Sequence, residues 1–176
     1  MKVQVINLSN NKLPQYETPM SAGVDIRADF SRVTVDNPIK AYGDCEIIFA
    51  SPKMDGNKVT MLRLDPGARA LIPTGLKIAL PEPKDGLVPT CLVQPRSGLA
   101  LKKGITVLNT PGLVDADFRD EVHVILINHG HEAVWIEDKE RIAQLVFGWA
   151  AKAEWEEVAR LNETDRKGGF GHTGEK

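Results

Sequence analysis

The stretch EVHVILIN, residues 121–128, indicates the fold class of this chain. Apolar and polar side chains alternate along it, and this period of two is typical of a β-strand with one buried face. Eleven prolines and fifteen glycines punctuate the sequence, with turn signals in DPG at 65–67 and TPG at 110–112. The pattern predicts an all-β domain, a sandwich or barrel of many short strands. Four further runs are similar: KVQVIN (2–7), KVTMLRL (58–64), ARALIP (68–73) and GLKIALP (75–81).

Two stretches depart from this pattern. RSGLALKKG (96–104) predicts a helix of one or two turns, with Ser97 as its N-cap and Gly104 just past its end. DKERIAQLVFGWAAKAEWEEVARL (138–161) is rich in Ala, Glu, Lys and Leu, so propensity favours a helix there. Its apolar residues run almost unbroken from Leu145 to Ala151, however, so the helical period is poor.

Length and charge limit the classes of function. The chain has 176 residues, which suits one well-packed domain, and its net charge of −2 argues against a protein that binds duplex nucleic acid. No apolar run approaches the ~20 residues that span a bilayer. The two cysteines, Cys45 and Cys91, and the lack of a secretory signal predict reduced thiols and a cytoplasmic location. We therefore expect no membrane partner and no stable nucleic-acid binding.

Residues 29–64 stand out as a candidate added module. CEIIFASPKMDGNKVTMLRL (45–64) holds two β-rich runs joined through Asp55-Gly56, a dipeptide typical of tight hairpins. An ordinary extra hairpin on the sheet is the favoured interpretation, ahead of a device that binds a partner protein.

Two stretches carry side chains suited to phosphate chemistry. QPRSGLA (94–100) sets Arg96 and Ser97 at the start of the short helix, where free amides and the helix dipole favour an anion. On local sequence alone, a plain capped helix with a surface arginine is favoured. GLVDADFRDE (112–121) holds four acids, and an extended backbone would let Asp115 and Asp117 share a divalent cation or poise a water. A polar turn leading into the next strand explains these acids equally well.

Other polar and aromatic positions have simpler explanations. Asp25 in SAGVDIRA (21–28) suits the outward face of a strand, and the same holds for Arg141 and Gln144 in ERIAQLVF (140–147). His129 and His131 in NHGHE are better explained by a solvated hairpin turn than by a metal site. The three tryptophans are expected in the core or at an interface: Trp135, Trp149 and Trp155.

The last eleven residues, RKGGFGHTGEK (166–176), combine flexibility with one aromatic ring. Four of the seven residues from Gly168 to Gly174 are glycine, which lets backbone amides approach an anion closely. Phe170 among them suits stacking on a nucleobase, a contact that contributes ~1–3 kcal/mol. Such a segment would close over a ligand like a lid. A frayed chain end is the competing interpretation.

Taken together, these motifs resemble the trimeric deoxyuridine triphosphatase (dUTPase) family. Each motif alone is weak, but five in order with near-correct spacing form a specific signal. The likeness covers nearly the whole chain outside residues 29–64, a gap that most relatives cross in a short strand and turn. The counterparts are SAGVDIRA at 21, PRSGLA at 95, GLVDADFRD at 112, RIAQLVF at 141 and RKGGFGHTG at 166, with LIPTGLKIALP at 71 also similar.

The resemblance implies an all-β, jelly-roll-like subunit of the dUTPase (β-clip) fold in a homotrimer, with active sites at subunit interfaces. It implies that RIAQLVF is a strand. It divides the chain into a β domain (1–162), with an extra β-hairpin insert at about 29–64, and a flexible glycine-rich C-terminal arm (163–176). The swapped arm would cross to close a neighbour's active site.

The resemblance also implies an activity. The expected reaction is hydrolysis of dUTP to dUMP and pyrophosphate, by water attack on the α-phosphorus with Mg²⁺ as cofactor. It would keep uracil out of DNA and supply dUMP for thymidylate synthesis. One competing interpretation is a dCTP deaminase-like or bifunctional relative, which lacks the GGFGHTG type of arm. The other is a non-catalytic, nucleotide-binding β-sandwich that acts as an interaction protein.

By position, the resemblance assigns roles to residues of the nucleoside end. Asp115 matches the carboxylate that orients and deprotonates the attacking water. Asn109 matches the side chain that reads the uracil edge, together with hairpin backbone between Gly112 and Val114. Phe118 lies where relatives usually have a tyrosine packed under the deoxyribose. Asp25 matches the acid that helps to hold magnesium through water, the metal being held mainly by the triphosphate.

The remaining matches concern the phosphates and the arm. Arg166 matches the arm arginine that engages the γ-phosphate, and Phe170 would stack on the uracil. The phosphate-contacting positions are Arg96, Ser97, Gly98 and Gln144. Gly171, His172 and Thr173 belong to the closing arm.

Three positions depart from the family pattern as we match it. Phe118 lacks the tyrosine hydroxyl. Asp120 stands where glycine is usual. Lys167 alone separates Arg166 from GGFG, where two residues are common.

Overall fold

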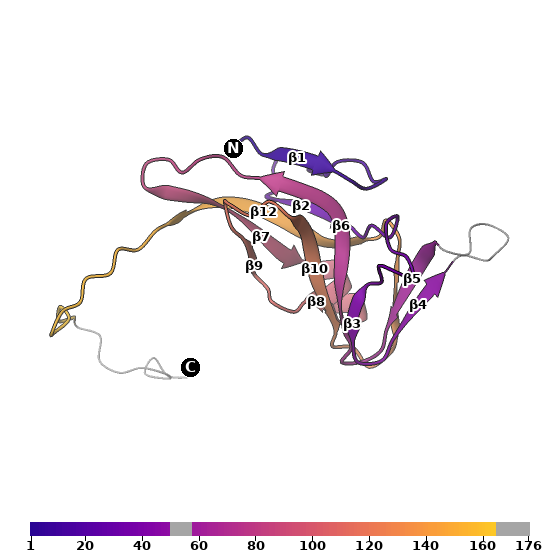
Figure 1. Cartoon of the computed structure of the whole chain (residues 1–176). Coiled ribbons are helices and arrows are strands. Elements are labelled where there is room, and N and C mark those ends of the chain that lie inside the picture. Colours follow the sequence, from indigo (N-terminus) through magenta and orange to yellow (C-terminus); the bar gives the residue numbers. More distant parts are fainter. Residues whose placement is uncertain (50–57, 165–176) are drawn as a thin grey trace.

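The structure is a computed structural model that describes residues 1–49 and 58–164. Strands dominate these residues, and α2 is the single helix among them (Figure 1). The strands before residue 80 are β1 Gln4–Asn7, β2 Gly23–Arg27, β3 Lys40–Tyr42, β4 Cys45–Phe49, β5 Val59–Leu64 and β6 Arg69–Ala79. The later elements are β7 Leu87–Pro95, α2 Ser97–Lys103, β8 Ile105–Val107, β9 Gly112–Val114, β10 Glu121–Asn128, β11 Val134–Glu137 and β12 Arg141–Ala151. The all-β prediction is confirmed.

The described strands form three antiparallel sheets. One sheet has the order β1-β6-β10-β8, with β3 also paired to β6. The others have the orders β2-β12-β7-β9 and β11-β5-β4. Inward side chains from all three sheets join one hydrophobic core, which includes Ile26, Leu62, Ile72, Leu126 and Leu145. Burial of this shared apolar surface is the main force that holds the sheets together.

Strand β12 answers whether the segment 138–161 is helical or extended, which its local pattern left open. The helix favoured by propensity over 138–161 is wrong, and the strand implied by the resemblance is confirmed. β12 pairs with β2 along one edge and with β7 along the other, and it buries Ile142, Ala143 and Leu145. Pairing on both edges outweighs modest helix propensities. Residues 152–164 are neither helix nor strand, and Figure 1 shows them running away from the sheets.

The runs predicted as separate strands at 68–73 and 75–81 form one strand, β6, that bends at Gly75. Gly75 has a φ of +71°, and a Cβ there would lie 2.5 Å from the Cβ of Ser9 and 2.7 Å from Oδ2 of Asp29. Only glycine fits this left-handed, crowded position. The bend is a β-bulge: Pro73 pairs with His123 and Lys77 with Glu121, so residues 74–76 face one residue of β10.

β4 and β5 pair as an antiparallel hairpin, as predicted, while its Asp55-Gly56 turn lies outside the described residues. β5 also pairs with β11. Val59, Leu62 and Leu64 are fully buried in the common core. This packing supports the interpretation of an ordinary hairpin on the sheet.

Helix α2 ends as predicted, with Gly104 in the left-handed region at φ 68° and its N–H bonded to the carbonyl of Ala100. The predicted N-cap is wrong by one residue. The carbonyl of Arg96 accepts the N–H groups of Leu99 and Ala100, so Arg96 is the N-cap and Ser97 is already helical.

The predicted core position of the tryptophans is wrong for a single chain, since Trp135, Trp149 and Trp155 are all exposed. The interface alternative stays a prediction. Cys45 and Cys91 are unpaired thiols, and burial raises the pKa of Cys91 to about 12, which makes it unreactive. No helix in the described ranges has the length and apolarity that a membrane crossing needs.

Candidate functional site

Strands β2, β12 and β7 bring several predicted phosphate contacts together. The strand register sets Asp25 opposite Gln144, and Arg96 follows directly after β7. Arg96 donates from Nε to Oδ1 of Asp25 at 3.0 Å, and Nη1 of Arg141 lies 3.2 Å from Oδ2 of the same carboxylate. Asp25 therefore holds two guanidinium groups in place, and Arg96 is not a loose surface arginine.

Gln144 is fixed beside this cluster. Its Nε2 donates to the carbonyl of Pro95 at 2.9 Å. Its Oε1 occupies the space where a side chain at Gly23 would lie, so glycine at position 23 makes room for it. The Nη1 of Arg96 donates to the carbonyl of Arg141 at 3.2 Å, which ties the end of β7 to the start of β12.

Ser97 and Gly98 are exposed at the start of α2. A Cβ built on Gly98 would meet nothing within 4 Å among the described residues. Glycine at position 98 is therefore not required by this chain's own packing, and the helix start has open space in front of it.

The connection from β8 to β9 carries the predicted uracil-reading residue. Asn109 lies there, and a Cβ on Gly112 would come within 3.1 Å of its Nδ2. Glycine at position 112 thus lets the Asn109 amide lie against β9. Val114 ends β9 opposite Cys91 of β7, so the hairpin backbone is anchored in the sheet.

Asp115 and Phe118 lie in a turn directly after β9. The N–H of Phe118 donates to the carbonyl of Asp115 at 3.2 Å, and both side chains are exposed. The extended backbone that would set Asp115 and Asp117 on one side is therefore wrong, and the polar-turn interpretation is right. The turn still presents the Asp115 carboxylate to solvent.

Arg119 and Asp120 complete this loop, and the sequence motifs gave no indication of the contacts that these two side chains make. Nη1 of Arg119 donates to the carbonyls of Ala116 and Phe118 at 2.7 and 2.8 Å, which braces the turn. Asp120 accepts from Nζ of Lys77 at 3.1 Å. Its φ is not positive, so the loop follows a path that needs no glycine at position 120.

Within one chain, the two groups of site residues lie far apart. The register that sets Val114 opposite Cys91 places Asp115 beside Thr90, near the middle of β7, whereas Arg96 directly follows the last residue of that strand. Thr90 and Arg96 are six positions apart along extended chain, which is about 20 Å. Asp25 and Arg141 line a cavity of about 150 Å³, and Asp115 lines a different cavity of about 710 Å³. One copy of the chain therefore does not bring Asp115 next to the Arg96 cluster.

The described ranges contain no cluster of three or more His, Cys, Asp or Glu side chains placed to hold a metal. His129 and His131 are exposed in the turn between β10 and β11, which supports the solvated-turn interpretation. Five predicted site residues lie outside the described residues, as does Lys167: Arg166, Phe170, Gly171, His172 and Thr173.

Comparison with known proteins identifies the family. The dUTPase family model matches residues 58–174. A Fusobacterium nucleatum protein named deoxyuridine 5'-triphosphate nucleotidohydrolase is 41% identical over 99% of this chain and 97% of its own length. A protein of the same name from Bdellovibrio bacteriovorus is 39% identical over 99% of this chain and 95% of its own. These alignments include residues 21–28 and 29–57, which precede the family model's match.

Solved structures agree on the fold. A variant of the Staphylococcus bacteriophage 80alpha dUTPase with dUpNHpp superposes with a TM-score of 0.70 and 20% identity over 98% of each chain. A dUTPase variant from phage phi11 of S. aureus, described with a structural Mg(II) ion, has a TM-score of 0.65 and 17% identity, covering 93% of this chain and 100% of that one. The jelly-roll-like β fold is thereby confirmed. On this evidence, the chain belongs to the dUTPase family.

Proposed function

We propose that this protein hydrolyses dUTP to dUMP and pyrophosphate, by attack of water on the α-phosphorus. The observation that carries the proposal is the 41% identity, across 99% of this chain, to a protein named for that activity. The reaction would keep uracil out of DNA and supply dUMP for thymidylate synthesis. Two unpaired thiols suit the reducing cytoplasm, where we place the protein.

Asp115 is the proposed catalytic base. Its exposed carboxylate stands at the start of the turn after β9, where it would orient a water molecule and accept its proton. The attacking oxygen forms a bond to the α-phosphorus as the bond to the bridging oxygen of pyrophosphate breaks. The Arg119 bonds that brace the turn favour a single orientation of Asp115.

The triphosphate would lie against Arg96, Ser97, Gly98 and Gln144. Arg96 enters the site already oriented by Asp25, so little side-chain entropy is lost when it binds phosphate. The exposed start of α2 offers backbone amides to the same oxygens. Arg166, outside the described residues, would engage the γ-phosphate from the arm.

The nucleoside would be recognised at the β8–β9 connection. Asn109 and the backbone between Gly112 and Val114 would read the uracil edge, and Phe118 would pack under the deoxyribose and exclude a 2′-hydroxyl. We propose that residues 163–176 form the closing arm, with Phe170 stacked on the uracil and Gly171, His172 and Thr173 completing the cover. Residues 1–162 would form the β domain.

Magnesium is the proposed cofactor, and the chain fits a metal that the substrate itself carries. Asp25 has both carboxylate oxygens engaged by arginines, so it suits contact through water better than direct ligation. Among the described residues no metal cage of acids and histidines exists, which fits a cation held mainly by phosphate oxygens. Bound Mg²⁺ would neutralise charge on the triphosphate.

A homotrimer is the proposed assembly. The ~20 Å between Asp115 and Arg96 in one chain supports a site completed by a second copy. The segment 152–164, which leaves the sheets with Trp155 97% exposed, suits an arm that reaches a neighbouring subunit. The homologues do not favour a dCTP deaminase activity for this chain.

The test is pyrophosphate release from dUTP, dTTP, dCTP and UTP at equal concentrations with Mg²⁺. We expect dUTP to be cleaved far faster than the other three. Ammonia release from dCTP would indicate a deaminase, and tight dUTP binding without pyrophosphate release would indicate an interaction protein. Either result would overturn the proposal.

A further inference from the structure

The loop that carries Asp115, residues 115–120, joins β9 to β10 and ends at Glu121. We infer that Glu121 is a positioning residue, which fixes this loop to the body of the domain and so sets the orientation of the Asp115 carboxylate. The inference rests on the proposed function, because the orientation of Asp115 matters only if the chain hydrolyses dUTP.

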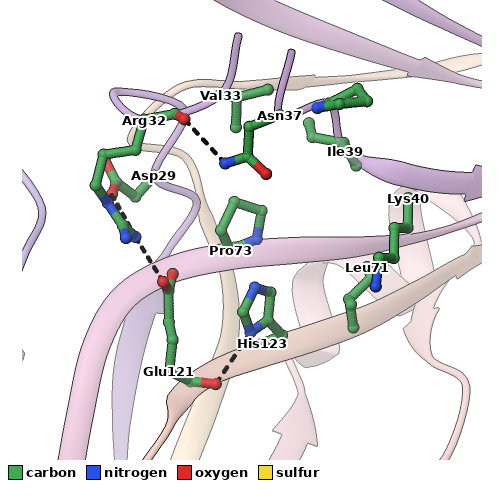
Figure 2. A pocket seen from close by; sticks show the side chains of 11 residues that line it. Asp29, Arg32, Val33, Asn37, Ile39, Lys40, Leu71, Pro73, Glu121 and His123 are labelled. Carbon is green, nitrogen blue, oxygen red and sulfur yellow. Dashed lines mark hydrogen bonds and ion pairs between the residues drawn. The ribbon is translucent and has the colours of Figure 1, made fainter. Parts of the chain in front are cut away.

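Two bonds from distant elements hold Glu121. Oε2 accepts from Nη2 of Arg32 at 2.7 Å, and Oε1 accepts from the backbone N–H of Gly75 at 2.8 Å. The Glu121 side chain is only 12% exposed. Figure 2 shows its carboxylate reaching toward Arg32, on the segment that follows β2. The Arg32 side chain is 39% exposed, so water screens the pair in part, but a charge-assisted bond with one partner mostly covered is stronger than a fully exposed one.

The bulge in β6 explains why a carboxylate is needed here. The ladder between β6 and β10 passes from Pro73 directly to Lys77, so the N–H of Gly75 bonds to the Glu121 side chain instead of a β10 carbonyl. Thr74 makes the matching bond from its hydroxyl to the carbonyl of Val122 at 2.5 Å. Side chains thus replace backbone pairing where β10 begins.

Arg32 is itself held in place. Its Nε and Nη2 lie 3.4 Å from Oδ2 of Asp29, which is 1% exposed. Oδ1 of Asp29 accepts from the backbone and hydroxyl of Ser31, and the Arg32 carbonyl accepts from Asn37. Figure 2 shows Arg32 between Asp29 and Glu121 at the wall of a cavity of about 260 Å³. The guanidinium that anchors Glu121 is therefore pre-oriented.

The other bonds of the loop cannot replace this anchor. The pair between Lys77 and Asp120 is exposed, with the Asp120 side chain at 83%, and such pairs contribute little. The two bonds from Arg119 stay within the loop and do not tie it to the domain. Among the described contacts that tie this loop to the domain, the Glu121 carboxylate is less exposed than the Asp120 carboxylate.

The test compares Glu121→Gln with Asp120→Asn. Gln keeps the size and an acceptor for Gly75 but removes the charge that holds Arg32. We expect kcat for dUTP to fall roughly tenfold, whereas KM should rise by no more than about threefold, because Phe118 moves with the loop but Asn109 and β9 are anchored separately on β7. Asp120→Asn removes only the exposed pair on the adjacent residue, so we expect both constants to stay within about twofold of wild type.

A second variant changes the other partner of the same ion pair. Arg32→Gln should lower kcat by a similar factor, and the double variant should lose little more than either single one, since both changes break one interaction. The inference fails if Glu121→Gln keeps the wild-type kcat. It also fails if KM rises in step with the loss of kcat, or if the variant no longer assembles, because either result would mark a purely structural role. Wild-type protein that leaves dUTP uncleaved is a different outcome, which rejects the proposed function itself.

Discussion

At the scale of single residues, Asp25 and Asp115 are carboxylates with different surroundings. Asp25 lies on a strand with one arginine on each oxygen, so its charge is used to orient Arg96 and Arg141. Asp115 follows a strand end and is exposed, and its backbone carbonyl closes a turn while its carboxylate faces no charged partner among the described residues. The second arrangement leaves a carboxylate available to a water molecule, and this difference underlies their proposed roles.

Asp115→Asn tests the proposed base, since the amide keeps the size but cannot accept the proton of water. We expect kcat to fall by about 10²–10⁴-fold, with the affinity for dUpNHpp nearly unchanged. Pyrophosphate release and calorimetry measure the two quantities. Asp117→Asn, two residues along the same turn, is the matched control and should keep near-normal turnover. A wild-type rate in Asp115→Asn would refute the role.

The pKa of Glu121 also predicts how the stability of the protein depends on pH. Burial alone raises the pKa of Glu121, but hydrogen bonds from Arg32 and Gly75 and the nearby charges of Arg32 and His123 outweigh it, and the pKa lies below its ordinary value of 4.5. A lowered folded-state pKa stabilises the protein above pH 4.5 and loses that contribution as pH falls through the folded-state value. The melting temperature of wild type should therefore exceed that of Glu121→Gln at pH 7. This difference in melting temperature should become smaller as the pH is lowered. A difference that stays constant down to low pH would contradict the lowered pKa of Glu121.

At the scale of elements, strand pairing and tight turns decide where the site residues lie. Helix α2 is only seven residues long, so it depends on its ends and its neighbours more than on propensity. Gly104 ends the helix in the left-handed region, directly against the backbone of the turn at Gly130. This contact holds the helix that carries Ser97 and Gly98.

Gly104→Ala should destabilise the protein, because it combines a left-handed backbone with a Cβ placed 2.6 Å from the Cα of Gly130. We expect a loss of roughly 2–4 kcal/mol in the free energy of unfolding. Gly67→Ala is the matched control: φ is also positive, at 80°, but a Cβ there meets nothing within 4 Å. Its loss should be about 1–2 kcal/mol. Urea denaturation at one fixed protein concentration measures both, and equal losses would show that the contact with Gly130 is unimportant.

At the scale of the whole molecule, Asp115 lies beside the middle of β7, and Arg96 lies just past the end of that strand. About 20 Å separates the two residues in one copy, so the proposed base could not serve the proposed phosphate contacts of the same copy. The proposed homotrimer would resolve this, since each copy would present its Asp115 loop to the Arg96 region of another. The exposed far end of β12, with Trp149 and the segment 152–164, is the surface that such an assembly would cover.

A mixing experiment tests this arrangement. Asp115→Asn and Gln144→Ala each disable one group of site residues, so each protein alone should be nearly inactive. Refolded together in equal amounts, random trimers should recover about a quarter of wild-type activity, because about one site in four then receives two intact halves. Mixing without refolding is the control. No recovery after verified co-assembly would show that one copy supplies both groups.

Local sequence predicted the parts of this protein that depend on short-range rules. EVHVILIN forms β10 with the predicted bounds, because alternation encodes a one-sided strand wherever that strand packs. Gly104 ends α2 as predicted, since a left-handed residue after a helix needs glycine. The motifs also identified the family, which the homologues confirm.

Tertiary structure decided what local sequence rules could not. The run at 141–151 became a strand because β2 and β7 bond to both of its edges, and no local propensity registers those partners. The bonds from Asp25 to Arg96 and from Glu121 to Arg32 join residues 71 and 89 positions apart. Sequence by itself determined the residue types and the strand pattern. Which carboxylate meets a guanidinium, and which stays open to water, depends on how the sheets bring distant segments together.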